Sequence, residues 1–200
     1  MKIGVLSIQG AVSEHLQRLK DCSVEAVTVK DPASLSSVSG LIIPGGESTT
    51  IGKLIELAGL KGPITELSKS GNLAIFGTCA GMVLMARQVI DGVEKQPKLE
   101  LMDIQVKRNA FGRQKESFET ELNFKPFEQT LTGVFIRSPL VREAGEGVEI
   151  MAAIPEGIVA ARQGNLLATS FHPELTNDTR IHQYFVDMCR NIKEVKKIKV

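Results

Sequence analysis

Three short apolar runs in the first 80 residues each lead into a glycine, and each is followed by a helical pattern. The runs are KIGVLSI (2–8), GLII (40–43) and NLAIF (72–76). They are short enough for strands, and the lack of polar alternation is typical of strands that are buried on both faces. The runs therefore predict a parallel sheet with helices on both sides, because parallel strands need helical crossovers.

The rest of the first half fits this alternation of strands and helices. Apolar residues at Val12, Leu16 and Leu19 have helical spacing. The expected strands are 2–8, 24–30, 40–46 and 72–77, and the expected helices are 11–22, a short turn after Asp31-Pro32, 48–57 and 80–90. The pattern indicates an α/β fold, a three-layer sandwich around a mostly parallel sheet.

After about residue 100 the pattern changes to short strands separated by Gly, Pro and Asn. The expected strands are 104–108, 118–122, 133–138, 148–154, 157–163 and 166–171. No linker separates the halves, so we expect antiparallel additions to the same sheet within one domain, residues 1–200.

A final helix is expected from about Asp178, because apolar residues recur at helical spacing from Ile181 to Val195. Asn177 or Asp178 can cap its start. Its basic end, KEVKKIKV, fits a solvated helix terminus or a contact with a partner.

Residues 77–81, GTCAG, place a cysteine between two glycines where a predicted strand turns into a helix. This is the pattern of a nucleophile elbow with Cys in place of Ser. Gly77 and Gly81 allow the strand and helix to approach closely, and the helix dipole favours a thiolate. Cys79 is therefore the predicted nucleophile, and the N–H of Ala80 is free to bind an oxyanion.

A thiolate nucleophile needs a base, and His172 is the best candidate among the histidines. It follows the predicted strand 166–171 in the sequence FHPEL, and Glu174 lies two residues further on. In an extended segment residues two apart point the same way, so Glu174 can orient His172. His15 and His182 lie in predicted helices, and we expect them at the surface or, for His182, in packing.

The turn IIPGGEST (42–49) is a second candidate part of the site. Its glycines let backbone N–H groups face a crevice at the carboxyl ends of the strands, where open α/β sheets bind ligands. The N–H groups of Gly46 and Ala80 together form a candidate oxyanion hole. The alternative is a plain tight turn, with Glu47-Ser48 starting a capped helix.

Charge and cysteine content exclude several classes of protein. The 24 Lys and Arg nearly cancel the 23 Asp and Glu, so nothing favours nucleic acid or an anionic membrane as a partner. No apolar run approaches the roughly 20 residues that span a bilayer. Cys22, Cys79 and Cys189 form neither a disulfide framework nor a zinc pattern. We expect a cytoplasmic protein with reduced thiols, in which Cys22 and Cys189 are structural.

Taken in this order, PGGES, GTCAG and FHPE resemble the class I, triad-type glutamine amidotransferases. Longer segments are similar to the glutaminase subunits of pyridoxal 5′-phosphate synthase: IGVLSIQGAVSEH, LIIPGGESTTI, KRNAFGRQKESFE (107–119), TGVFIRSP (132–139) and SFHPELTND (170–178). The resemblance covers nearly the whole chain. It implies a flavodoxin-like three-layer fold with antiparallel strands in the C-terminal half.

The resemblance also implies site residues. Cys79 attacks the side-chain amide of L-glutamine, His172 passes the proton to the leaving ammonia, and Glu174 orients His172. The implied substrate-binding positions are Gly46, Glu47, Ser48, Arg108, Ile136 and Arg137. Arg108 suits the α-carboxylate of glutamine and Glu47 its α-ammonium. Without the resemblance, both arginines are equally well read as surface charges.

The implied partner is the separate (β/α)₈-barrel synthase subunit, which takes up the ammonia through a channel and binds the phosphosugars. Gln9 is the implied link between the oxyanion hole and that partner. No cofactor and no metal is implied for this chain, since pyridoxal phosphate is the product of the complex.

Three alternatives stay open at this point. The chain could feed a different synthase, of the imidazole glycerol phosphate or anthranilate type, although RNAFGRQ and FIRSP argue against it. It could be a standalone thiol hydrolase, although the acid of α/β-hydrolases precedes the histidine. It could be a non-catalytic domain, which the retained Cys, His and Glu disfavour.

Overall fold

The computed structural model describes residues 1–92, 96–111 and 117–198, with side chains as far as residue 192. Three predictions lie wholly or partly outside the described residues: positions 112–116 of the segment 107–119, the place of Val195 in the apolar stripe of the last helix, and the basic side chains of KEVKKIKV.

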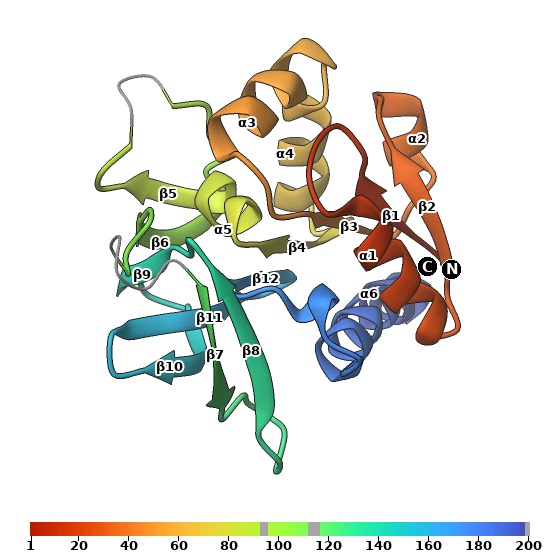
Figure 1. The fold of residues 1–200 in the computed structure, drawn as a ribbon. Coiled ribbons are helices and arrows are strands. Elements are labelled where there is room, and N and C mark those ends of the chain that lie inside the picture. The colour runs from red at the N-terminus through yellow and green to blue at the C-terminus, as the bar shows by residue number, and fades with distance from the viewer. Residues whose placement is uncertain (93–95, 112–116, 199–200) are drawn as a thin grey trace.

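A mostly parallel sheet forms the centre of the molecule (Figure 1). Its parallel part has the order β2 (Glu25–Val29), β1 (Lys2–Leu6), β3 (Gly40–Ile43), β4 (Ala74–Thr78) and β12 (Leu166–Thr169). The first four of these strands were predicted as the parallel core. β12 joins them from the far end of the chain, so the segment before His172 runs beside the strand before Cys79.

The C-terminal half extends this sheet, as predicted, and adds a separate hairpin. The added strands are β11 (Gly157–Gln163), β10 (Glu149–Ile154), β9 (Leu140–Ala144), β6 (Met102–Lys107) and β5 (Ala86–Val89), and the hairpin consists of β7 (Ser117–Leu122) and β8 (Leu131–Ile136). Most of these pairings are antiparallel, while β5 and β6 run parallel. The expected α/β fold with antiparallel additions is confirmed.

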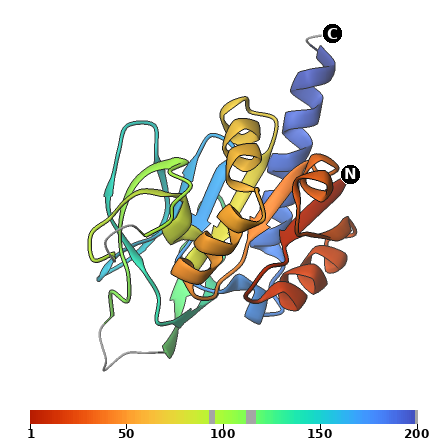
Figure 2. The same ribbon diagram turned by 90° about the horizontal axis from the view of Figure 1, so that it is seen from above.

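Helices and the hairpin cover the two faces of the sheet. The helices are α1 (Val12–Asp21), α2 (Pro32–Ser36), α3 (Ser48–Leu57), α4 (Lys61–Lys69), α5 (Ala80–Met85) and α6 (Arg180–Ile198), with a 3₁₀ turn η1 (Pro173–Leu175). One apolar cluster packs α2 to α5 on one face, and a second packs α1, α6 and the β7–β8 hairpin on the other. Figures 1 and 2 show these two layers on opposite sides of the strands.

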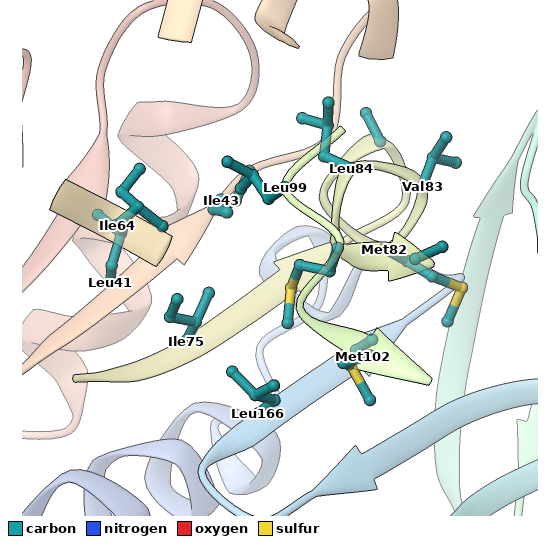
Figure 3. Packing of buried hydrophobic residues seen from close by; sticks show 14 of the residues in the cluster. Leu41, Ile43, Ile64, Ile75, Met82, Val83, Leu84, Leu99, Met102 and Leu166 are labelled. Atoms are coloured by element: carbon teal, nitrogen blue, oxygen red, sulfur yellow. The ribbon is translucent and has the colours of Figure 1, made fainter. Parts of the chain in front are cut away.

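Side-chain alternation along the central strands explains their continuous apolar runs. Leu41 and Ile43 of β3 point into the first cluster, whereas Ile42 points into the second. Figure 3 shows the first cluster, where Leu41, Ile43 and Ile75 from the strands meet Ile64 of α4. Both faces of these strands are buried from solvent, so neither face needs polar residues.

Three elements differ from the sequence predictions. The helix expected over 80–90 ends at Met85, because Ala86 has extended backbone (φ −65°, ψ 142°) and starts β5. Helix α4 was missed because Gly62 and Pro63 look like a turn, although proline is tolerated in the first turn of a helix. Strand β9 was missed because two of its five residues, Arg142 and Glu143, are charged and exposed, so its apolar run is only two residues long.

No helix in the described part of the chain combines the length and the apolarity that crossing a membrane requires.

Candidate active site

Cys79 stands at a strained turn between β4 and α5. Its backbone has φ 49° and ψ −98°, a region that non-glycine residues rarely adopt. Its N–H donates to the carbonyl of Thr169 on β12 at 2.8 Å, which fixes the turn. A Cβ on Gly77 would lie 2.6 Å from the backbone carbon of Gly81, so the strand and helix touch where the glycines stand. The geometry is that of the expected elbow.

His172 and Glu174 form a buried pair. His172 Nδ1 lies 2.8 Å from Glu174 Oε1. The two residues are 8% and 4% exposed. The expected reason for their proximity was an extended segment, but Glu174 lies in the 3₁₀ turn η1, and that turn brings the carboxylate back to the ring. The N–H of His172 donates to the carbonyl of Val134 at 2.8 Å, which ties this segment to β8.

Gly45 shows how close His172 and Cys79 lie. A Cβ added at Gly45 would be 2.5 Å from His172 Cε1 and 3.5 Å from Cys79 Cβ. Burial lowers the pKa of His172, but hydrogen bonds with Cys79 and Glu174 outweigh it and raise the pKa to about 10. A charged imidazolium beside a sulfur is the arrangement that favours a thiolate.

A pocket of about 500 Å³ opens over the sulfur. Its lining includes Cys79 and His172 and every other residue predicted for the site except Glu174, namely Gln9, Gly46, Glu47, Ser48, Ala80, Arg108, Ile136 and Arg137. Glu174 lies behind His172, where it contacts the ring and not the pocket. The pocket is large enough for an amino acid.

Glu47 caps the start of helix α3, so the alternative prediction for IIPGGEST, a tight turn followed by a capped helix, also holds. Its Oε1 accepts from the N–H of Thr49 at 3.0 Å, and its Oε2 accepts from the N–H and the hydroxyl of Thr50 at 2.7 Å each. Burial is the largest single effect and raises the pKa of Glu47, but the hydrogen bonds from Thr49 and Thr50 together outweigh it and lower the pKa to about 2. The carboxylate therefore stays charged at the mouth of the pocket.

Gln96 holds two of the predicted substrate-binding residues together, and sequence reasoning missed it. Arg108 Nη1 donates to Gln96 Oε1 at 2.9 Å, and Gln96 Nε2 donates to Ser48 Oγ at 3.1 Å. Arg108 Nη2 lies 3.6 Å from Glu47 Oε1. Gln96 belongs to no motif, so no signal in the sequence could have singled it out.

Gln9 and its neighbours hold the glycine turn from the other side. Gln9 Oε1 accepts from the N–H of Glu47 at 3.1 Å, and a Cβ on Gly46 would lie 2.5 Å from the same oxygen. The carbonyl of Gly45 accepts from the N–H of Ala11 at 3.2 Å. The orientation of the Gly45–Gly46 peptide is thus tied to the loop that carries Gln9.

Ile136 and Arg137 reach the site from the end of β8. The carbonyl oxygen of Ile136 lies 4.0 Å from Cys79 Sγ. Arg137 has a positive φ of 44°, and the N–H of Ile136 donates to Ser138 Oγ at 3.1 Å. The local turn therefore presents main-chain groups to the sulfur.

The prediction that His15 lies at the surface is wrong, and the surface alternative for His182 is wrong as well. Both residues have no exposed surface. They lie on the inner faces of α1 and α6, where both rings make edge contacts with Phe76 of β4. Cys22 and Cys189 are buried in the second apolar cluster, between the sheet and helices α1 and α6, which suits the structural role expected of them.

Within the described residues no group of three or more Cys, His, Asp or Glu side chains could hold a metal ion.

Comparison with known proteins places the chain in a family. The sequence profile of the SNO glutamine amidotransferase family matches residues 5–191. The chain belongs to this family. The relatives of this amidotransferase include two proteins named pyridoxal 5′-phosphate synthase subunit PdxT. The one from Geobacillus kaustophilus is 50% identical over 199 residues, which is 100% of both chains. The one from Pelotomaculum thermopropionicum is 53% identical over 190 residues, 94% of this chain and 95% of the relative.

Solved structures agree with the family assignment. A crystal structure described as a glutamine amidotransferase superposes with a TM-score of 0.90 at 45% identity, and the match covers 94% of this chain and 98% of that one. The crystal structure of a putative GMP synthase subunit from Thermoplasma acidophilum superposes with a TM-score of 0.70 at 18% identity, covering 98% of each chain. The second likeness concerns the fold alone.

Proposed function

We propose that this chain is a glutaminase that hydrolyses L-glutamine to L-glutamate and ammonia and delivers the ammonia to the synthase subunit of pyridoxal 5′-phosphate synthase. The observation that carries the proposal is the buried His172–Glu174 pair beside Cys79 at the strained turn. The substrate and the assembly follow from relatives that are about half identical over the full chain and are named as subunits of that synthase.

The proposed chemistry gives Cys79, His172 and Glu174 distinct roles in one triad. The thiolate of Cys79 attacks the δ-carbonyl carbon of glutamine, and the N–H groups of Gly46 and Ala80 stabilise the oxyanion. The His172 imidazolium then donates its proton to the leaving nitrogen, which departs as ammonia and leaves a glutamyl thioester. His172 next takes a proton from water, which attacks the thioester and releases glutamate. Glu174 holds Nδ1 throughout.

The charges around the pocket suit the two ends of an amino acid. Arg108, braced by Gln96, is placed to pair with the α-carboxylate. Glu47 Oε1 accepts one hydrogen bond, from Thr49, and faces Arg108 Nη2 at 3.6 Å, which is longer than a hydrogen bond, so it has capacity left for the α-ammonium. Ser48, Ile136 and Arg137 complete the binding site in this proposal.

The partner in this proposal is the (β/α)₈-barrel synthase subunit, and Gln9 connects it to the oxyanion hole. The support is that Gln9 Oε1 holds the N–H of Glu47, directly after the glycine turn. A partner that moved this loop would move the Gly45–Gly46 peptide with it. We therefore expect the synthase subunit to activate the glutaminase.

We also propose that residues 1–200 act as one amidotransferase domain in the cytoplasm. Both apolar clusters pack on the same sheet, which supports a single folding unit. A nucleophilic thiol works only while it is reduced, and a reducing cytoplasm keeps it so.

Ammonia release from glutamine tests the proposal. We expect the wild-type chain to release ammonia much faster with the synthase subunit than without it, and we expect Cys79→Ala to release none above background. Cys22→Ala is the matched control, because Cys22 lies in the core away from the pocket, and it should keep its activity. Equal rates with and without the synthase subunit would refute activation by the partner, and full activity in Cys79→Ala would refute the mechanism.

A further inference from the structure

The second oxygen of Glu174 faces a residue that the mechanism above does not use. While Oε1 contacts His172, Oε2 lies 3.5 Å from Nε2 of His15, and both side chains have no exposed surface. At that length Oε2 has no full hydrogen-bond partner among the described residues. Burying a carboxylate oxygen away from water lowers the stability of the fold unless an N–H donates to it.

His15 is the donor that is available, and its ring spans two parts of the site. Its Nε2 also lies 3.2 Å from the hydroxyl of Thr78, the residue directly before Cys79. Its Nδ1 lies 2.9 Å from Nε2 of His182 on α6. One imidazole therefore contacts both the strand end that carries the nucleophile and the carboxylate of the triad.

Both histidines of this network are neutral. Burial is the largest effect on His15, and together with His182 and His172 it lowers the pKa of His15 well below its usual value. Burial, with a smaller effect from Arg18 that exceeds the opposing one of Asp21, lowers the pKa of His182 to about 3. The contact between His15 and Glu174 is therefore made by a neutral ring and a carboxylate.

The partners of the two rings select one tautomer. If His15 carries its proton on Nε2, it can donate to Thr78 and Glu174, and His182 Nε2–H donates to His15 Nδ1. His182 Nδ1 is then a bare lone pair, which agrees with its lack of a hydrogen-bond partner among the described residues. The opposite tautomer would bury an N–H on His182 Nδ1 without an acceptor and turn a lone pair of His15 toward Glu174 Oε2. The first arrangement leaves fewer polar groups unsatisfied.

We infer that His15 is a positioning residue for the glutaminase reaction: its Nε2–H, shared between Thr78 Oγ1 and Glu174 Oε2, holds the carboxylate that orients His172. The inference rests on the proposed function. It assigns His15 no contact with substrate and no proton transfer. Its effect belongs to the chemical step and not to the binding of glutamine, because His15 does not line the pocket.

A pair of variants of nearly equal size tests this role. In His15→Gln the amide nitrogen stands as many bonds from the backbone as Nε2 does, so the donor is kept, whereas His15→Met fills the space without a donor. In the complex with the synthase subunit, we expect His15→Met to lower kcat by about three- to tenfold, the value of an ordinary hydrogen bond, because the 3.5 Å contact is longer than a full charge-assisted one. We expect KM for glutamine to stay within about twofold and His15→Gln to restore most of the lost kcat.

The same variants are compared for thermal unfolding, because a purely structural role would lower the stability of both. A folded His15→Met that keeps the wild-type kcat would overturn the inference. So would an equal loss of kcat in both variants, or a loss that appears in KM alone.

Nitrogen NMR of the wild-type rings tests the tautomer without any activity assay. We expect Nε2–H on both His15 and His182, and an Nδ1–H tautomer of His15 would overturn the inference while leaving the proposed function intact. Conversely, a wild-type complex that released no ammonia would overturn the proposed function, and with it the catalytic part of this inference, whatever tautomer the spectrum showed.

Discussion

The protonation of His172 is the property of a single residue on which the site depends most. Burial of the ring disfavours the charged form and by itself would lower the pKa. Contacts with Cys79 and Glu174 outweigh burial and raise the pKa of His172 to about 10. His172 should therefore be an imidazolium from acidic pH through neutrality and lose its proton only as pH rises through about 10. His15 and His182, with lowered pKa values, should stay neutral around neutral pH, and His182 should gain a proton only as pH falls through about 3.

NMR titration of the three histidine rings checks this assignment. We expect one ring, that of His172, to be charged at pH 8 and the other two to be neutral. In Cys79→Ala the pKa of His172 should fall, because one of the two groups that raise it is gone. Titration of His172 near its ordinary value of 6.5 in the wild type, or no change in Cys79→Ala, would contradict the coupling of the two side chains.

At the scale of the element, the turn between β4 and α5 depends on glycine where backbone approaches backbone. A Cβ on Gly81 would lie 2.2 Å from the carbonyl oxygen of Ile43 on β3, and main chain cannot move aside as a side-chain tip can. The same turn sets the backbone of Cys79 in its strained conformation. The close packing of α5 against β3 therefore also sets the position of the Cys79 sulfur, so a change that pushes α5 away should move both.

Gly81→Ala should destabilise the fold by about 1–3 kcal/mol, the usual cost of overpacking, and should also lower ammonia release. Gly62→Ala is the matched control, because Gly62 stands in helix α4 with nothing within 4 Å of its added Cβ. That change should alter stability by less than about 1 kcal/mol, because the gain in helix propensity is opposed by the restriction that Pro63 places on a preceding residue with a Cβ. Urea unfolding measures both values, and equal stability of the two variants would contradict the close approach.

At the scale of the whole molecule, the site arises where strand ends meet. β3 leads to the glycine turn, β4 to Cys79 and β12 to His172, and these three strands are neighbours in the sheet. Residues more than 90 positions apart, such as Cys79 and His172, come together because β12 pairs with β4. Loops from the N-terminal segment and from β8 then close the pocket.

This topology explains what the sequence could and could not predict. Apolar runs followed by glycine identify the buried parallel strands β1, β3 and β4 and the turn that carries Cys79, so these were predictable. Strand β12 was expected among the antiparallel additions, and its parallel pairing with β4, which brings His172 beside Cys79, was not predicted. Gln96, His15 and His182 were not, because their importance comes from packing between distant elements. A histidine on an amphipathic helix gives no sign that its face meets Phe76 and Glu174 rather than water.

Covalent labelling with a reactive glutamine analogue tests the central claim most directly. A diazoketone that carries the amino-acid end of glutamine should enter the pocket and alkylate the sulfur, and peptide mapping by mass spectrometry then locates the adduct. The account predicts a single adduct on Cys79, protection by excess glutamine, and no adduct in Cys79→Ala. An adduct on Cys22 or Cys189 instead, or labelling of Cys79 that glutamine does not slow, would contradict it.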